Sequence, residues 1–198
     1  MPPANLQIHQ MTAPKTQFYG ATSLDGFLST ADDNIDWLLQ FGDVPPSYAP
    51  FIAQIGAIAM GAATYEWLIA HHVQPGSPQP QPWPYAQPTW VFTHRELPRL
   101  SSADLRFVSG DVRPVHAAMR EHAGDKNLWI VGGGELVGQF CDHDLLDELI
   151  VQIAPVTLRT GKPLLPRSII SPALKLVSVQ QFGAFAELTY EVPKIRSR

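Results

Sequence analysis

The sequence predicts an α/β protein built on one mostly parallel sheet of about eight strands, with an antiparallel pair at its C-terminal edge. Two observations lead to this fold class. An apolar run that reaches glycine and continues into helix-permitting residues occurs twice, at 57–69 and at 128–137, and each is typical of a strand, a tight turn and a helix. The chain closes with two strand-like runs, 174–182 and 184–192, joined by Gly183. Strands separated by helices pair in parallel, whereas strands joined by a tight turn pair antiparallel.

The overall composition is typical of one globular domain. The chain has 198 residues, of which 45% are hydrophobic and 16% are charged, which suffices for a sizeable core. The formal net charge is −4 and no cluster of Lys and Arg occurs, so no nucleic-acid partner is expected. No apolar run approaches the roughly 18 residues that span a bilayer, and the N-terminus lacks the pattern of a secretory signal. A single cysteine, Cys141, excludes an intramolecular disulfide, and these features together favour a cytoplasmic protein without a membrane partner.

The individual elements follow from apolar periodicity and capping residues. Residues 1–15 are polar and contain three prolines, so we expect a flexible tail there and a single domain at 16–193. The first strand, 16–22, runs into a turn at 23–27 that carries Asp25 and Gly26. The other expected elements are helices at 35–41 (capped by Asn34), 47–55 (capped by Ser47), 64–69 and 111–124 (capped by Asp111), and strands at 57–61, 89–93, 105–109 and 147–158.

The segment 71–88 stands out because six of its residues are prolines. A polyproline-like surface loop is the interpretation we favour, since proline lacks the backbone N–H that helices and sheets require. A ligand for a proline-binding module is the alternative. The sequence leaves open whether this loop closes over a site or lies outside it.

The strongest functional signal is the run of three glycines, Gly132–Gly134, between an apolar strand and a helix. Glycine permits a positive φ and lets the backbone approach a ligand closely. The free N–H groups at the start of the following helix, with the positive end of its dipole, suit a phosphate. This predicts a nucleotide cofactor. The alternative is that the glycines serve only a close strand–helix turn, because the pattern, completed by Gly138, lacks the acidic residue of a full dinucleotide fingerprint within 149–157.

Polar or glycine-rich residues follow several of the predicted strands. They occur at Asp25–Gly26, at Gly61, at Thr93–Arg95 and at Gly132–Glu135. In open parallel sheets, ligands bind at the carboxyl ends of the strands. We therefore expect these four segments to line one edge of the sheet and to form the site.

Five segments in this order resemble the dihydrofolate reductase superfamily, in particular its branch with the reductase domain of the bifunctional riboflavin-biosynthesis deaminase/reductase. The resemblance covers residues 16–192 and implies a single-domain, dihydrofolate-reductase-like three-layer sandwich. The resemblance also allows a homodimer, which we expect. The segments that carry it are Ala21–Phe27, Ile35–Leu38, Met60–Glu66, Val91–Arg95 and Ile130–Gly134.

The resemblance also implies NADPH as cofactor. In that family the glycine turn and the start of the helix after the Met-Gly strand hold the pyrophosphate, Thr93–Arg95 lie by the 2′-phosphate, and the Ser23–Gly26 stretch is a mobile loop over nicotinamide and substrate. This chain departs from the family at Ala62 and Ala63, where a basic residue is frequent. The preference for NADPH over NADH is therefore left open. The expected cofactor-binding residues are Gly61, Thr64, Thr93, His94, Arg95, Gly132, Gly133, Gly134, Glu135 and Leu136.

Two carboxylates are predicted to assist the chemistry by delivering or orienting a proton. Asp36 begins a helix roughly where folate-reducing relatives keep their carboxylate, and Asp25 lies in the loop turn. The alternatives are structural: Asp36 favours a helix N-terminus, and Asp25 before glycine forms a turn. Cys141–Asp144 has no partner pair elsewhere, so no metal site is predicted.

The expected activity is NADPH-dependent reduction of a small heterocyclic substrate, similar to that of 5-amino-6-(5-phosphoribosylamino)uracil reductase. The alternatives are reduction of dihydrofolate or another pteridine, of a flavin or a carbonyl compound, and a non-catalytic nucleotide-binding dimer. No His/Cys zinc motif of a deaminase occurs, so we expect a reductase domain without that second activity.

Overall fold

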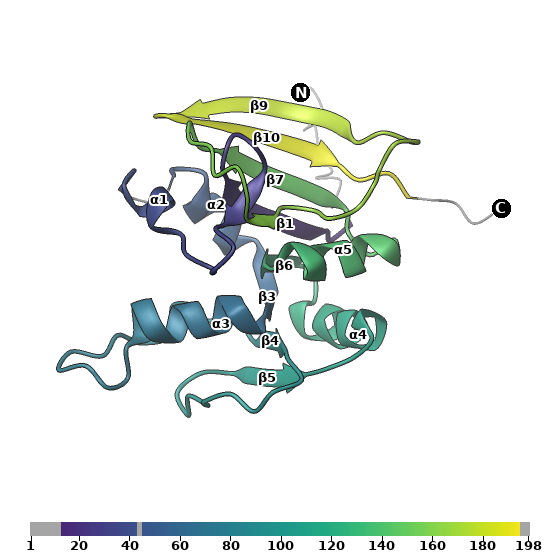
Figure 1. The fold of residues 1–198 in the computed structure, drawn as a ribbon. Coiled ribbons are helices and arrows are strands. Elements are labelled where there is room, and N and C mark those ends of the chain that lie inside the picture. The colour runs from purple at the N-terminus through teal and green to yellow at the C-terminus, as the bar shows by residue number, and fades with distance from the viewer. Residues whose placement is uncertain (1–12, 43–44, 195–198) are drawn as a thin grey trace, which may run out of the picture.

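The structure, a computed structural model, describes residues 13–42 and 45–194. It contains the predicted eight-stranded sheet, in the order β5-β4-β3-β6-β1-β7-β10-β9 (Figure 1). All pairs from β5 to β7 are parallel, and β10 is antiparallel to both β7 and β9. A small second sheet pairs β2 (Phe27–Ser29) with β8 (Lys162–Pro163). The strands of the main sheet are β1 (Thr16–Thr22), β3 (Ile55–Gly61), β4 (Thr89–Phe92), β5 (Leu105–Val108), β6 (Asn127–Gly132), β7 (Glu148–Ile153), β9 (Lys175–Phe182) and β10 (Phe185–Glu191).

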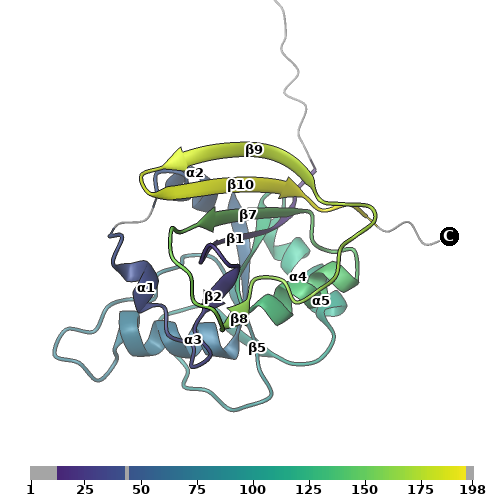
Figure 2. The ribbon, with the colours of Figure 1, turned by 45° about the horizontal axis from the view of Figure 1, so that its top comes forward.

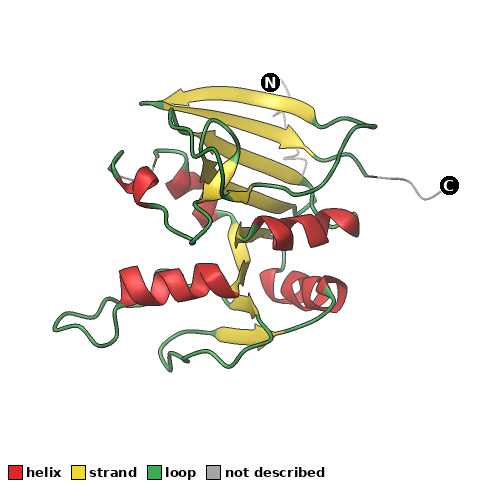
Figure 3. Cartoon of the chain, in the orientation of Figure 1, coloured by secondary structure: helices red, strands yellow, loops and turns green. Residues whose placement is uncertain are grey.

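Helices cover the sheet on both sides, which gives three layers (Figure 3). One face packs against α4 (Val112–Ala123) and α5 (Gly134–Asp142). The other face packs against α2 (Tyr48–Ala53), α3 (Ala62–Leu68) and the short π-helix η1 (Ile69–Val73). The predicted three-layer sandwich is therefore confirmed. Within the described part of the chain, no helix is long and apolar enough to cross a bilayer.

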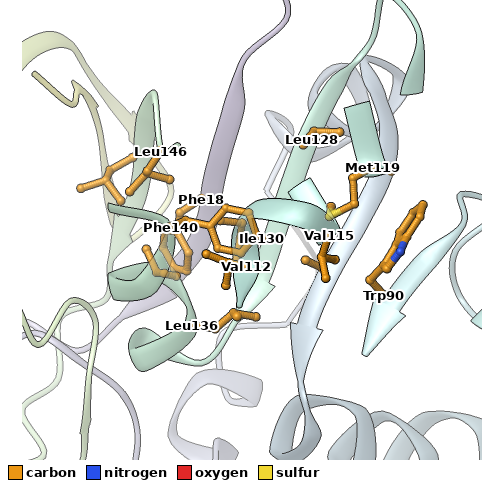
Figure 4. Close-up of a cluster of buried hydrophobic side chains, with 14 of the residues drawn as sticks. Phe18, Trp90, Val112, Val115, Met119, Leu128, Ile130, Leu136, Phe140 and Leu146 are labelled. Atoms are coloured by element: carbon orange, nitrogen blue, oxygen red, sulfur yellow. The ribbon is translucent and has the colours of Figure 1, made fainter. Parts of the chain in front are cut away.

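Two hydrophobic clusters lie on opposite faces because side chains alternate along each strand. Phe18 and Leu128 belong to the cluster under α4 and α5, where Phe140 and Met119 also lie (Figure 4). Their neighbours Tyr19 and Trp129 point into the other cluster. The first cluster is mainly aliphatic, whereas the second is rich in aromatic rings, and the second borders the site.

The two short helices near the N-terminus differ from the prediction. Helix α1 spans only Asp36–Leu39, and its dihedrals place the cap at Ile35. Asn34 still caps the turn, because its Oδ1 accepts a hydrogen bond of 2.6 Å from the backbone N–H of Asp36. Ser47 is the N-cap of α2, but its hydroxyl makes no capping bond. It donates instead to the Glu187 carboxylate at 2.7 Å, because that buried acid needs a partner.

The predicted strand at 147–158 is too long, since β7 ends at Ile153. The chain leaves the sheet there to bond with the turn after β1. The carboxylate of Asp25 accepts from the backbone N–H groups of Leu158 and Arg159 at 3.0 and 2.8 Å, and Val156 accepts from Leu24. The apolar residues after Ile153 continue the strand pattern in the sequence. In the structure, however, this segment bonds to the turn at Asp25, so β7 ends before it.

The proline-rich segment 71–88 is a loop except at its start, which belongs to η1. It packs against the molecule, because Trp83 is buried with its ring 5.7 Å from that of Tyr65. Most of the predicted tail lies outside the described residues. Lys15 is described, and its ammonium pairs with the buried Glu148 at 2.6 Å.

Candidate functional site

A cavity of about 990 Å³ lies at the carboxyl ends of β1 and β6. One part of it, the glycine part, is formed by Ala63, Thr64, the segment 132–135 and the β8 strand. Another part, the aromatic wall, is formed by Tyr19, Tyr48, Tyr85 and Trp129. Trp129 precedes Gly132 by three positions on β6, which corresponds to about 10 Å along a strand. The cavity is therefore long enough for two different groups side by side.

The glycine part is built around a backbone that side chains would block. Gly133 is the N-cap of α5 with φ of +89°, and no side chain caps this helix. A Cβ on Gly132 would lie 2.7 Å from Thr64 Oγ1, and one on Gly134 would collide with the Pro163 carbonyl. The N–H groups of the first helical turn have no partner within the helix. Gly132 and Gly134 thus allow close packing, and Gly133 leaves an open position before free donors.

An ion-pair network holds the start of α5. The Arg167 guanidinium binds Glu135 at 2.7 Å and Asp142 at 2.8 Å. The hydrogen bonds from Arg167 hold the pKa of Glu135 below its usual value. Gly138 makes this possible, because a Cβ there would lie 2.7 Å from the guanidinium carbon. The fourth glycine of the motif therefore accommodates a salt bridge.

The predicted cofactor residues divide into two groups. Thr64 and the segment 132–135 line the cavity, as expected. Arg95 lies outside the cavity lining, and its guanidinium pairs with Glu66 at 2.7 Å with the side chain 61% exposed. The remaining predicted residues, which also lie outside the lining, are Gly61, Thr93, His94 and Leu136.

Neither predicted catalytic carboxylate lines the cavity. Asp36 is exposed, and its carboxylate accepts a 2.9 Å bond from the Asn34 amide. Asp25 accepts from the Ser23 hydroxyl and from two backbone N–H groups beyond β7, and these bonds lower its pKa, the Ser23 bond most of all. In this structure Asp25 anchors the loop turn to the segment after β7.

A buried polar network at the cavity wall was not predicted. Ser47 donates to the Glu187 carboxylate, so its oxygen accepts from the Tyr19 hydroxyl at 3.0 Å. The Gln152 amide nitrogen donates to Tyr19 at 2.6 Å and to Glu187 at 2.8 Å. Burial raises the pKa of Tyr19 most strongly, and the nearby charge of Glu187 raises it further. The sequence signal was present, because Gln152 and Glu187 are polar residues inside apolar strands and face each other across the β7–β10 pair.

The aromatic wall was not predicted either. The rings of Tyr48 and Tyr85 lie 6.1 and 5.4 Å from that of Trp129. Tyr85 comes from the proline-rich segment, so that loop contributes directly to the cavity.

Helix α1 and the β9–β10 turn lie at the same end of the molecule (Figures 1 and 2), where the rings of Phe41 and Phe185 are 5.1 Å apart.

The comparisons with known proteins agree with this architecture. The sequence matches the RibD C-terminal domain family over residues 78–186. The chain belongs to this family. It is also 34% identical over 178 residues to the uncharacterized protein YwjB of Bacillus subtilis (strain 168), covering 89% of this chain and 97% of YwjB.

Solved structures show the same fold for this member of the RibD C-terminal domain family. A putative riboflavin biosynthesis protein from Shewanella sp. PV-4 superposes with a TM-score of 0.75 at 22% identity, covering 91% of this chain and 99% of that one. Dihydrofolate reductase from Enterococcus faecalis, complexed with NADP(H), superposes with a TM-score of 0.61 at 15% identity, covering 89% and 95%. The family match confirms the predicted reductase-domain branch, and these superpositions confirm its dihydrofolate-reductase-like fold.

Proposed function

We propose that this protein is an NADPH-dependent reductase of a small heterocyclic substrate, similar to 5-amino-6-(5-phosphoribosylamino)uracil reductase. The observation that carries the proposal is Gly133, which has a positive φ and lies before the uncapped N-terminus of α5 at a large cavity. A phosphate-bearing group suits such a position. The fold is also that of a dihydrofolate reductase complexed with NADP(H).

The residues of the glycine part fit a dinucleotide. The open position at Gly133 is one that a Cβ would fill, and the N–H groups of Gly134 and Glu135 would hold the pyrophosphate. The Arg167 guanidinium neutralises Glu135, which removes a charge that would repel phosphate. Bound there, NADPH would supply the hydride.

The chain's own residues would orient the substrate ring and exclude water. Tyr19 and Gln152 bring a hydrogen-bonded network to the cavity wall, and the half-buried Tyr48 and Tyr85 offer apolar ring surface beside the buried Trp129. The catalytic roles of Asp36 and Asp25 stay predictions, because both carboxylates lie outside the cavity lining.

The test is a titration of the purified protein with NADPH and, separately, with NADH, followed by tryptophan fluorescence. His94 and Arg95 are the remaining basic candidates for the 2′-phosphate, since Ala62 and Ala63 replace the frequent basic residue, and Arg95 carries the permanent charge. We expect Arg95→Ala to weaken NADPH by about tenfold and to leave NADH unchanged, as loss of a charge-assisted hydrogen bond predicts. Arg113→Ala, which breaks a comparably exposed pair with Asp111 outside the cavity lining, is the matched control. Absence of binding by either nucleotide at micromolar concentration would refute the proposed function.

We also propose that two copies associate through β9. This strand is the edge of the sheet, and its side chains Leu176, Val177 and Val179 are 51–62% exposed. An exposed apolar edge strand offers unpaired backbone groups to a second strand. Sedimentation should give the mass of a dimer for the unmodified protein and a smaller mass for Val177→Lys. A monomeric mass for both proteins would contradict this association.

A further inference from the structure

The aromatic wall, formed by Tyr19, Tyr48, Tyr85 and Trp129, lines the cavity. Tyr48 and Tyr85 are half-buried and present ring surface to it, whereas Tyr19 and Trp129 are buried and support them from the core. Tyr48 and Tyr85 flank Trp129 at ring distances of 6.1 and 5.4 Å, with interplanar angles of 66° and 85°. Tyr19 completes the wall from β1, with its ring 6.1 Å from that of Tyr48. Aromatic faces and edges arranged in this way pack best against another planar ring.

The charges of the cavity disfavour an anion at this wall. Among the described residues that line the cavity, Lys162 is the one cation, and Asp33 and Glu135 are the acids. Lys162 belongs to β8, which abuts Gly134 through Pro163, so it lies with the glycine part. Its ammonium is 3.9 Å from the Asp33 carboxylate. Among the residues that the structure describes, no basic side chain therefore remains at the aromatic wall to bind a phosphate. A phosphorylated substrate would lose its hydration there without compensation.

Gln152 adds a hydrogen-bond acceptor of fixed direction. A carboxylate only accepts hydrogen bonds, so the amide group that faces Glu187 must be the nitrogen. The same nitrogen donates to the Tyr19 hydroxyl. The amide oxygen therefore points the other way, and it has no partner among the described residues. Gln152 is buried and lines the cavity, so we infer that this oxygen is the atom of the wall left to accept from an N–H of a ligand packed against it.

Tyr48 and Tyr85 add donors. Neither hydroxyl makes a hydrogen bond within the part of the chain that the structure describes. Burial raises the pKa of both, so both hydroxyls keep their protons at neutral pH and can donate to a carbonyl. The wall thus combines planar stacking surfaces, one acceptor and two donors.

We propose that the aromatic wall binds an uncharged planar cyclic amide, a ring that carries N–H and C=O groups and no phosphate, with Gln152 as the residue that recognises the N–H. This inference rests on the proposed function and names its substrate class. It distinguishes the substrate of this chain from a phosphoribosyl pyrimidine.

Three isoalloxazines serve as probes, because they share one planar ring and differ by one group each. Riboflavin carries the cyclic N3–H, 3-methylriboflavin lacks that hydrogen, and riboflavin 5′-phosphate adds a phosphate. Each is titrated with and without saturating NADP⁺, which would occupy the phosphate position at Gly133, and is followed by flavin fluorescence anisotropy. The three affinities are compared with NADP⁺ bound, or without nucleotide where the protein binds none. We expect riboflavin to bind at least about tenfold more tightly than either relative, because each change leaves a polar group unpaired.

Two variants locate the effect. Gln152→Met should remove the preference for riboflavin over 3-methylriboflavin. Tyr85→Phe, which removes a hydroxyl without hydrogen-bond partners in the described chain and keeps the ring, should weaken riboflavin several-fold without loss of thermal stability. Tyr190→Phe, on β10 outside the cavity lining, is the matched control and should change nothing.

The outcomes separate the two proposals. Equal or tighter binding of riboflavin 5′-phosphate, no preference against 3-methylriboflavin, or no binding of riboflavin would overturn the inference about the wall, even where NADPH binds. Selective binding of riboflavin by a protein that binds neither NADPH nor NADH would support the wall and overturn the proposed reductase.

Discussion

Gly133→Ala distinguishes a cofactor-binding glycine from one that only shapes a turn. Gly133 has φ of +89°, and the added Cβ would meet no atom closer than 3.8 Å. The substitution therefore brings backbone strain without a collision. A left-handed backbone costs a non-glycine residue about 1–2 kcal/mol. For a chain of this length that corresponds to a fall in Tm of roughly 2–8 °C.

Gly124→Ala is the matched control for this strain. Gly124 also has a positive φ, of +57°, and no atom lies within 4 Å of its added Cβ. It follows α4 and precedes β6, so it lies near the amino end of β6, whereas the cavity lies at the carboxyl end of that strand. Differential scanning calorimetry should show a comparable fall in Tm for both variants.

The NADPH titration then separates the two roles. The methyl group at Gly133 would fill the open position before the N-terminus of α5, so we expect NADPH affinity to fall by at least about tenfold, or about 1.4 kcal/mol. Gly124→Ala should retain the affinity of the unmodified protein. If both variants bind NADPH equally well, the glycine turn is structural, and the assignment of the glycine part to the cofactor is refuted.

Three further predictions concern stability. Gly134→Ala should destabilise the fold by about 1–3 kcal/mol in urea unfolding, because its Cβ collides with the carbonyls of Pro163 and Leu164; an unchanged midpoint would contradict the close packing of β8 on α5. Ser47→Ala should cost about 1–3 kcal/mol by leaving the buried Glu187 short of a donor, whereas a neutral result would mean that water replaces the hydroxyl. Burial lowers the pKa of His116, so its neutral form favours the folded state, and this contribution should be present above the unfolded pKa of about 6.5 and be lost as pH falls through the lower folded pKa; His116→Gln should flatten that acid-side slope in thermal melts.

Much of the fold could be predicted because its signals are local. The apolar run that ends at Gly132 and the capping Asp111 each specify an element within a few residues, and both were correct. The Asp111 side chain accepts from the Arg113 N–H at 2.9 Å, as an N-cap should. The end of β7 was wrong because the bonds to Asp25 that end the strand come from a residue distant in sequence.

The site was predicted only in part for the same reason. Most of the glycine part lies within one contiguous strand–turn–helix unit, so its pattern can be recognised from neighbouring residues in the sequence. The aromatic wall takes Tyr19, Tyr48, Tyr85 and Trp129 from four separate segments, and Gln152 gains its direction from Glu187 on another strand.

The sequence by itself thus determined the α/β class, the mostly parallel sheet and the glycine turn, because hydrophobic period and backbone freedom act over neighbouring residues. Tertiary structure alone decided which partner each charged side chain has. Arg95 binds Glu66, Arg167 binds Glu135, and Lys162 approaches Asp33. Coulombic and hydrogen-bond partners are chosen by distance in space, so the neutral aromatic wall became visible only once the chain was folded.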